Sequence, residues 1–259
     1  MHLKRLLVAL VVVPALYLYI KYVPPLFFFV LIALISYLCL LEFLSMYKTN
    51  LLARHMFSLF GMIPVYLTYK YNDIPISAVI AVFLLISVIR LYGKKTADNA
   101  IFDLAPYWTG FFYIPFVLSY FVKLRAIGTE LVISLLVIIW VADSFALYVG
   151  KAIGRRKLYE TMSPNKTVEG AVAAIIGAVL STLAMKAVYC FTIPAVKAVF
   201  IGVVLGIFGI IGDLVESMFK RDAGVKDSGV ILPGHGGLLD KMDGMIFSAP
   251  VLYYLILYF

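Results

Sequence analysis

The chain has 259 residues, of which 64% are hydrophobic and only 14% are charged, and its mean hydropathy is +1.03. Soluble domains are typically about half apolar and about a quarter charged, so this composition excludes an ordinary soluble domain and predicts an integral membrane protein. The formal net charge of +8 does not indicate a nucleic-acid partner, because cytoplasmic loops of membrane proteins carry an excess of Lys and Arg.

Apolar stretches of about 20 residues, the length that a helix needs to cross the hydrocarbon core, recur along the whole chain. About nine of them predict one all-α, polytopic bundle over residues 1–259, with no soluble domain and no internal repeat. The fifth stretch contains Pro106, Gly110 and Pro115, so a broken or re-entrant segment is an alternative there. The stretches lie near residues 5–21, 25–44, 51–69, 75–92, 105–122, 127–149, 168–189, 195–219 and 239–258.

Two features that resemble those of an exported protein have simpler explanations. Lys4 and Arg5 precede the first apolar stretch, but no convincing small-residue cleavage site follows, which favours a retained span over a signal peptide. Cys39 and Cys190 both lie in apolar stretches, and we interpret them as small hydrophobic residues rather than as disulfide partners or metal ligands.

The positive charges are distributed unequally between the two sides of the predicted bundle. Sixteen of the 22 Lys and Arg residues fall on the side that holds the N-terminus and the connections after the second, fourth, sixth and eighth stretches. The positive-inside rule predicts that this side, and therefore the N-terminus, is cytoplasmic. The connections at 150–167 and 220–238 then open on the same face and can build one site.

The most polar segment of the chain, residues 217–243, lies between the last two long apolar stretches. It contains four carboxylates and five glycines, together with five basic groups when His235 is counted. Such a segment is costly to keep beside a membrane, which indicates that the chemistry occurs there.

Acids in apolar helices need a cationic partner. Asp143, Asp213 and Glu216 fall near the C-terminal ends of predicted helices, where the helix dipole repels negative charge. Asp213, Ser217 and Lys220 follow one another at i, i+4 and i+7 and therefore share a helix face. Asp213 is accordingly either half of an intramembrane ion pair, with Lys220 or with a Lys elsewhere, or a metal ligand.

Asp240 and Asp243 begin the ninth stretch, one helical turn apart. Acids in a first turn stabilise any helix, so a metal-binding and a purely structural role are equally compatible with this position alone. The glycines of the segment allow backbone N–H groups to approach phosphates, or simply form turns in a mobile loop.

The order of these residues is recognisable. In 217–243 the pattern is Ser217, Lys220-Arg221, Lys226-Asp227, Pro233, His235-Gly236-Gly237, Asp240 and Asp243. Residues 143–170 add Asp143, Gly150-Lys151, Gly154-Arg155, Ser163-Pro164-Asn165-Lys166-Thr167 and Glu169-Gly170. The chain thus resembles the phosphatidate cytidylyltransferases (CDP-diacylglycerol synthases), which make CDP-diacylglycerol from CTP and phosphatidic acid. It departs from their pattern at Lys241, where Arg is usual, and at Leu147, where an aromatic residue is usual.

The resemblance implies roles for individual residues. Asp213 and Asp240 are the expected Mg²⁺ ligands, with a second cation as an open alternative, and Lys226, Asp227 and Asp243 complete the catalytic set. Residues 126–259 would carry catalysis and residues 1–125 would serve as scaffold. The expected substrate contacts, led by Lys166 and Arg155 as phosphate ligands, are Asp143, Lys151, Arg155, Ser163, Asn165, Lys166, Thr167, Ser217, Lys220, Arg221, His235, Gly236, Gly237 and Lys241. Thr167 or Ser163 can also cap the helix that follows.

The implied function is cytidylyl transfer to phosphatidic acid for phospholipid biosynthesis, at the cytoplasmic face of the cell's inner membrane, by a protein that forms homodimers and binds no nucleic acid. Two alternatives within the CTP-dependent lipid enzymes are a polyprenol kinase and a CDP-archaeol synthase. A transporter is a third, less favoured alternative, because the polar residues gather at one face of the membrane rather than near its midplane.

Overall fold

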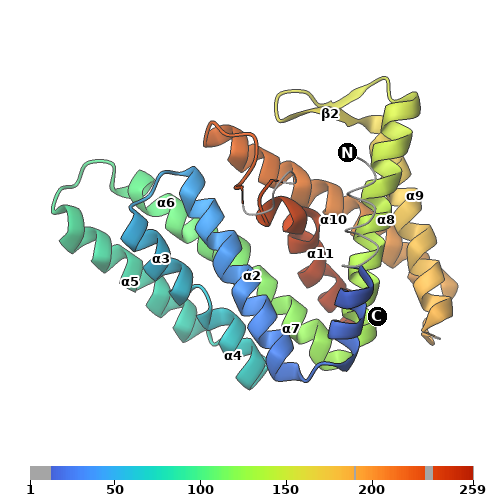
Figure 1. Ribbon diagram of the computed structural model, residues 1–259, viewed down its shortest axis with the longest axis horizontal. Helices are drawn as coiled ribbons and strands as arrows, with labels where there is room; N and C mark the ends of the chain where they lie inside the picture. The colour runs from blue at the N-terminus through green and yellow to red at the C-terminus, as the bar shows by residue number, and fades with distance from the viewer. Residues whose placement is uncertain (1–12, 190, 231–235, 259) are drawn as a thin grey trace.

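The computed structural model describes residues 13–189, 191–230 and 236–258, and helices make up most of them (Figure 1). Residues 13–22 are helical. The elements that follow are α2 (Pro25–Met46), α3 (Leu51–Phe60), α4 (Ile63–Tyr71), α5 (Ile76–Lys94), α6 (Ala100–Phe111), the π-helical η1 (Phe112–Phe116), α7 (Val117–Ile127), α8 (Thr129–Ile153), β1 (Lys157–Tyr159), β2 (Ser163–Thr167), α9 (Val168–Val188), α10 (Ala195–Asp222) and α11 (Leu239–Tyr258).

Seven helical segments of the described chain are long and apolar enough to cross a membrane, which agrees with the predicted polytopic all-α bundle. They are Pro25–Met46, Leu51–Tyr71, Ile76–Lys94, Ala100–Ile127, Thr129–Ile153, Val168–Val188 and Ala195–Asp222. The predicted stretch at 239–258 forms α11, which begins with the charged residues Asp240, Lys241 and Asp243 and is not one of the seven. Of the stretch predicted at 5–21, residues 13–21 are helical and residues 5–12 lie outside the described residues.

The proline-containing fifth stretch is neither broken nor re-entrant. Helices α6 and α7 are joined without interruption by η1, a π-helical turn that contains Pro115. A proline lacks the N–H that a helix interior uses, and its ring needs room on the preceding turn, so the wider π-helical turn accommodates it. Pro106 lies within α6 and does not end it.

A small antiparallel hairpin, β1 and β2, is the one departure from an all-helical fold among the described residues. Lys157 pairs with Thr167 and Tyr159 pairs with Ser163. The pairing satisfies backbone groups of a polar connection in which no helix forms. Figure 1 shows the hairpin extending sideways from the upper end of α8.

Glycines of α10 allow α9 and α10 to pack closely. A Cβ at Gly202 would lie 2.6 Å from the Cα of Val179, and a Cβ at Gly206 would lie 2.9 Å from the Cα of Ile175. Small residues of this kind let membrane helices approach until their backbones touch. The contact fixes how α10 is rotated, and therefore where its polar side chains point.

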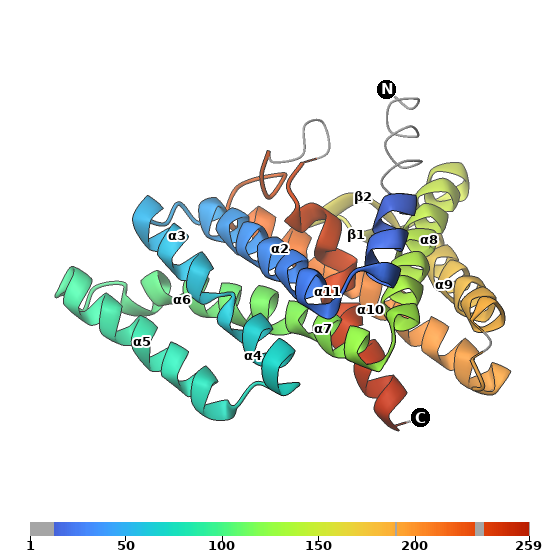
Figure 2. The same ribbon diagram turned by 60° about the horizontal axis from the view of Figure 1, so that its bottom comes forward.

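Helix α2 connects the two halves of the chain. It contacts α3, α4, α6 and α7, and it also contacts α11, beside which it lies in Figure 2. Tyr47 follows the last residue of α2, and its hydroxyl donates to Oδ2 of Asp222, the last residue of α10, at 3.0 Å. Burial, and then the hydrogen bond to Asp222, raise the pKa of the Tyr47 phenol above its usual value.

The ends of the helices lie along two opposite edges of the molecule. In Figure 1 the α2–α3 and α5–α6 connections, the β1–β2 hairpin and the C-terminal end of α10 lie along the upper edge. The α4–α5, α7–α8 and α9–α10 connections lie along the lower edge. This alternation is what the sequence predicts for consecutive spans, and it places both polar segments at the same end of the bundle.

Candidate active site

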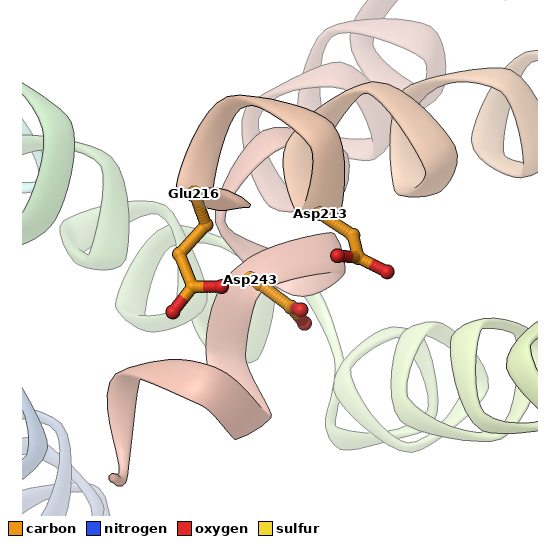
Figure 3. Close-up of side chains that lie close together, drawn as sticks. All are labelled: Asp213, Glu216 and Asp243. Carbon is orange, nitrogen blue, oxygen red and sulfur yellow. The ribbon is translucent and has the colours of Figure 1, made fainter. Parts of the chain in front are cut away.

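An acidic cluster joins α10 to α11. Asp213 and Glu216 of α10 and Asp243 of α11 each offer a carboxylate oxygen, and these oxygens lie within 4.8 Å of one another. Figure 3 shows Asp243 between the other two, with all three side chains directed into the same space. Glu216 is fully buried, whereas Asp213 and Asp243 are half-buried. Three acids this close require positive charge nearby.

The cluster exists because the backbones of α10 and α11 touch at this point. A Cβ at Gly212 would lie 2.5 Å from the carbonyl oxygen of Asp243, and a Cβ at Gly244 would lie 3.3 Å from that of Gly209. Glycine is the residue that permits such an approach. The Gly244 N–H also donates to Oδ1 of Asp243 at 2.7 Å, which orients this carboxylate.

Two lysines neutralise part of this negative charge. Lys166 of β2 lies 2.6 Å from Asp213, and Lys220 lies 2.5 Å from Glu216 and 2.7 Å from Asp240. The sequence left open whether the lysine partner of Asp213 is Lys220 or a lysine elsewhere in the chain. In the structure the partner is Lys166.

The donor set suits a divalent cation. Oxygen ligands from one or two carboxylates, completed by substrate phosphates and water, are what Mg²⁺ prefers. Oε1 of Glu216 is buried, and no hydrogen bond to it is present within the described part of the chain. Asp243 likewise forms no ion pair with the described residues. The unpaired oxygens of these two acids, together with Asp213, can hold a metal ion.

The structure groups the acids differently from the sequence-based prediction. Asp240 does not join the cluster; its carboxylate binds Lys220 at 2.7 Å and accepts from the backbone N–H groups of Gly237 and Ser228 at 2.7 and 3.1 Å. Glu216, which was not named as a ligand, takes part in the cluster instead. Its position three residues after Asp213 was the available signal, because that spacing places both acids on one helix face.

The two polar segments meet, as the sequence predicts. Thr167 caps α9 by accepting from the Gly170 N–H at 3.1 Å, which confirms one of the two caps considered. The adjacent Lys166 then reaches Asp213 on α10. The Arg221 guanidinium donates from Nε to the carbonyl of Met162, between the hairpin strands, at 3.2 Å. Residues 143–170 and 217–243 thus form one polar region.

The remaining sequence-predicted residues surround this region. Ser217 is buried on α10, and its hydroxyl lies 3.4 Å from Oδ1 of Asp213. Gly236 has a left-handed φ of 85°, and Gly237 is buried against Ser228. His235 lies outside the described residues, and Ser163 is half-buried in β2. The exposed side chains are Asp143, Lys151, Arg155, Asn165, Lys226, Asp227 and Lys241.

The sequence matches one family model and is similar to several named relatives. The family model described as "Cytidylyltransferase family" matches residues 3–259. A phosphatidate cytidylyltransferase of Bacillus subtilis is 43% identical over 150 residues, which are 57% of this chain and 56% of that protein. One from Staphylococcus saprophyticus is 36% identical over 187 residues, covering 72% of this chain and 71% of the relative. One from Staphylococcus aureus is 39% identical over 145 residues, covering 56% of each.

Proposed function

Since this chain belongs to the cytidylyltransferase family, we propose that it transfers a cytidylyl group from CTP to phosphatidic acid and releases pyrophosphate. The observation that carries the proposal is the acidic cluster of Asp213, Glu216 and Asp243 with Lys166 and Lys220 beside it. The three relatives named above carry the same activity in their names, which supports the choice of substrates.

The proposed reaction exchanges one phosphoanhydride bond for another. An oxygen of the lipid phosphate attacks the α-phosphorus of CTP, the bond to the β-phosphate breaks, and pyrophosphate leaves. A phosphate monoester has a second pKa of about 6, so the attacking oxygen is largely ionised at neutral pH and needs no strong general base. The protein must therefore bring two anionic substrates together and stabilise the charge that moves onto the pyrophosphate.

The residues of the cluster are suited to this work. Asp213, Glu216 and Asp243 would hold Mg²⁺, which when bound supplies charge neutralisation at the triphosphate. Lys166 and Lys220 present ammonium groups at the same place. The sequence-based assignment of Asp240 as a metal ligand stays a prediction, and its contact with Lys220 supports a role in holding that ammonium in position.

The exposed basic side chains are proposed to attract and bind the phosphates. Lys151, Arg155, Lys226 and Lys241 are all exposed in the two polar segments that meet at the cluster. A concentration of positive charge at one end of the molecule raises the local concentration of anionic substrates. Individual roles for Lys226 and Asp227 in catalysis, and for Ser163, Asn165 and His235 in binding, remain predictions from the family resemblance.

We propose further that this end of the bundle faces the cytoplasm of the cell, with the phosphatidate acyl chains in the bilayer. The connections along this edge are the ones to which the positive-inside count assigns most of the Lys and Arg residues. The homodimer implied by the resemblance stays a prediction, which the mass of the detergent-solubilised protein tests.

Labelled CTP tests the reaction class directly. Detergent-solubilised protein is incubated with Mg²⁺, phosphatidic acid and CTP labelled at either the α- or the γ-phosphate. We expect α-label in CDP-diacylglycerol, γ-label in pyrophosphate, and no product after chelation of the metal. Parallel reactions contain a polyprenol or an archaeal-type lipid phosphate in place of phosphatidic acid.

Each alternative gives a different result in this assay. Transfer of γ-label to polyprenol would indicate a kinase, and α-label only in the archaeal-type lipid would reassign the substrate. Folded protein that makes no product from any lipid would overturn the enzymatic proposal. Proton-coupled ion flux in liposomes without CTP would then support the transporter.

A further inference from the structure

A buried carboxylate of the N-terminal half faces the polar segment that precedes α11. Glu42 of α2 is only 3% exposed. Its Oε1 accepts from the Leu238 N–H at 3.0 Å, and its Oε2 accepts from the Leu239 N–H at 2.9 Å. The Ser228 hydroxyl lies 3.2 Å from Oε2. One side chain thus binds both sides of the connection between α10 and α11, almost 200 residues further along the chain.

The polar segment wraps this carboxylate closely. A Cβ at Gly229 would lie 2.6 Å from Oε1 of Glu42, and a Cβ at Gly237 would lie 2.5 Å from Oε2. Side chains at either position would displace the carboxylate. These two glycines therefore have a structural reason to lack a Cβ that is independent of any approach to phosphate.

A chain of polar contacts continues from Glu42 to the acidic cluster. The Ser228 hydroxyl also lies 3.1 Å from Oδ2 of Asp240, and the Ser228 and Gly237 N–H groups donate to the same oxygen. Asp240 in turn binds Lys220, and Lys220 binds Glu216. The position of the first turn of α11, which also carries Asp243, is thus coupled to α2.

We propose that Glu42 is a positioning residue for the reaction at the acidic cluster. Its carboxylate holds Ser228, Leu238 and Leu239 so that Asp240 stays on Lys220 and Asp243 stays in the cluster. The inference rests on the proposed function for its effect on turnover. It assigns to the N-terminal half, which the sequence suggested was only a scaffold, a direct part in forming the site.

The chemistry of the contact favours a carboxylate over its neutral analogue. The partners of Glu42 are two N–H donors and a hydroxyl, and a carboxylate accepts at both oxygens. Gln has nearly the same shape, but its amide nitrogen would face one of these donors and leave it unpaired in a buried place. A negative charge is also stabilised at the N-terminal end of α11, where the first N–H groups have no acceptor within the helix.

The test compares Glu42→Gln with Ser36→Ala. Ser36 lies on the same helix and is equally buried, and its hydroxyl has no hydrogen-bond partner among the described residues, so it controls for disturbance of α2 itself. We measure kcat and KM for CTP, the melting temperature in detergent, and hydrogen–deuterium exchange of the backbone amides at 236–241. The exchange measurement requires no substrate.

For Glu42→Gln we expect faster exchange at 236–241 but unchanged exchange in α8 and α9. We expect kcat to fall roughly 10- to 100-fold, with a smaller change in KM. Losses of this size are typical of residues that hold the side chains which in turn contact the metal or the substrate. Glu42→Asp keeps both acceptors on a shorter side chain and should recover part of the loss. Ser36→Ala should resemble the unsubstituted protein.

Several results would overturn the proposal. Unchanged exchange at 236–241 in Glu42→Gln, or faster exchange with unchanged kcat, would show that Glu42 does not position the site. If Glu42→Gln fails to fold, Glu42→Asp becomes the test variant. Failure of both to fold, with Ser36→Ala folded, would make Glu42 a general stability residue instead. If the unsubstituted protein makes no CDP-diacylglycerol, the proposed function fails, while the exchange result still decides whether Glu42 orders the start of α11.

Discussion

At the scale of single residues, the candidate site depends on which acids are paired and which are not. Lys166 balances Asp213, and Lys220 is shared between Glu216 and Asp240. Asp243 has a backbone N–H donor but no cation among the described residues. A divalent ion and the substrates would complete this balance of charge, since clustered acids are costly without it.

Substitution of the acids separates metal ligands from positioning groups. Asp213→Asn and Asp243→Asn should each lower kcat roughly 100-fold and raise the Mg²⁺ concentration needed for half-maximal rate. Neither should unfold the protein, because each removes one of several adjacent negative charges. Asp240→Asn should also lower kcat, but at an unchanged Mg²⁺ requirement, because Asp240 contacts Lys220 rather than the cluster.

The measurements are Mg²⁺ titrations of initial rate together with the melting temperature of each variant. Glu160→Gln, an exposed carboxylate in the hairpin turn, is the matched control and should leave both unchanged. A raised Mg²⁺ requirement in Asp240→Asn would instead support the sequence-based assignment of Asp240 as a metal ligand. Near-normal activity in Asp213→Asn or Asp243→Asn would remove that residue from the metal site.

Lys166 offers a second test at this scale. Lys166→Gln removes the ammonium beside Asp213, so we expect kcat/KM for CTP to fall roughly 10- to 100-fold. Lys166→Arg keeps the charge with a different geometry and should retain more activity. Lys70→Gln, an exposed lysine at the opposite edge of the molecule, controls for a general change of charge. Equal activity of Lys166→Gln and the control would show that the reaction does not need the Lys166 ammonium group.

At the scale of elements, close backbone contact determines how α10 and α11 present their acids. The contact at Gly212 brings Asp243 against α10, and the glycines between α9 and α10 hold α10 in its rotation. Hydropathy indicates that these helices exist, but it does not define their rotation about their own axes. That rotation decides whether Asp240 or Asp243 lies next to Asp213.

Gly212→Ala should therefore damage both stability and activity. The added Cβ would lie 2.5 Å from a backbone oxygen, which cannot move aside as a flexible side chain would. We expect a loss of about 1–3 kcal/mol in the free energy of unfolding, as for other overpacked contacts, and a larger relative loss of kcat.

The matched control for this substitution is Gly93→Ala, within α5, where an added Cβ meets nothing within 4 Å. Replacing glycine by alanine in an unobstructed helix should be neutral or stabilising by up to about 1 kcal/mol. Melting temperature and turnover in detergent compare the two variants. Wild-type turnover in Gly212→Ala would show that the cluster does not need the close contact of α10 and α11.

At the scale of the whole molecule, the alternation of helix ends between two edges defines a topology that can be measured. If the edge with the hairpin is cytoplasmic, a cysteine at Glu160 should react with a membrane-impermeant maleimide only from the cytoplasmic side. A cysteine at Asp73, between α4 and α5, should react only from the opposite side. The labelling is carried out in a variant without Cys39 and Cys190, using vesicles of both orientations. Reaction of both cysteines from one side would contradict the proposed topology.

Local features of the chain made much of this protein predictable. Hydropathy over windows of about 20 residues marks the spans, because crossing the bilayer is a property of each segment by itself. The cap at Thr167 also follows from local sequence, as does the gathering of charge at one edge. The order of polar residues in 143–170 and 217–243 was sufficient to indicate the family.

Only the tertiary structure decided which side chains meet. Lys166 lies against Asp213, Glu216 joins the cluster in place of Asp240, and Glu42 of α2 binds the start of α11. These contacts join residues that are 3 to 197 positions apart in the sequence. They depend on how each helix is rotated about its axis and on the close backbone contact that glycines permit. A sequence read segment by segment contains the side chains of the site, whereas the packing of α2, α10 and α11 against one another determines their arrangement.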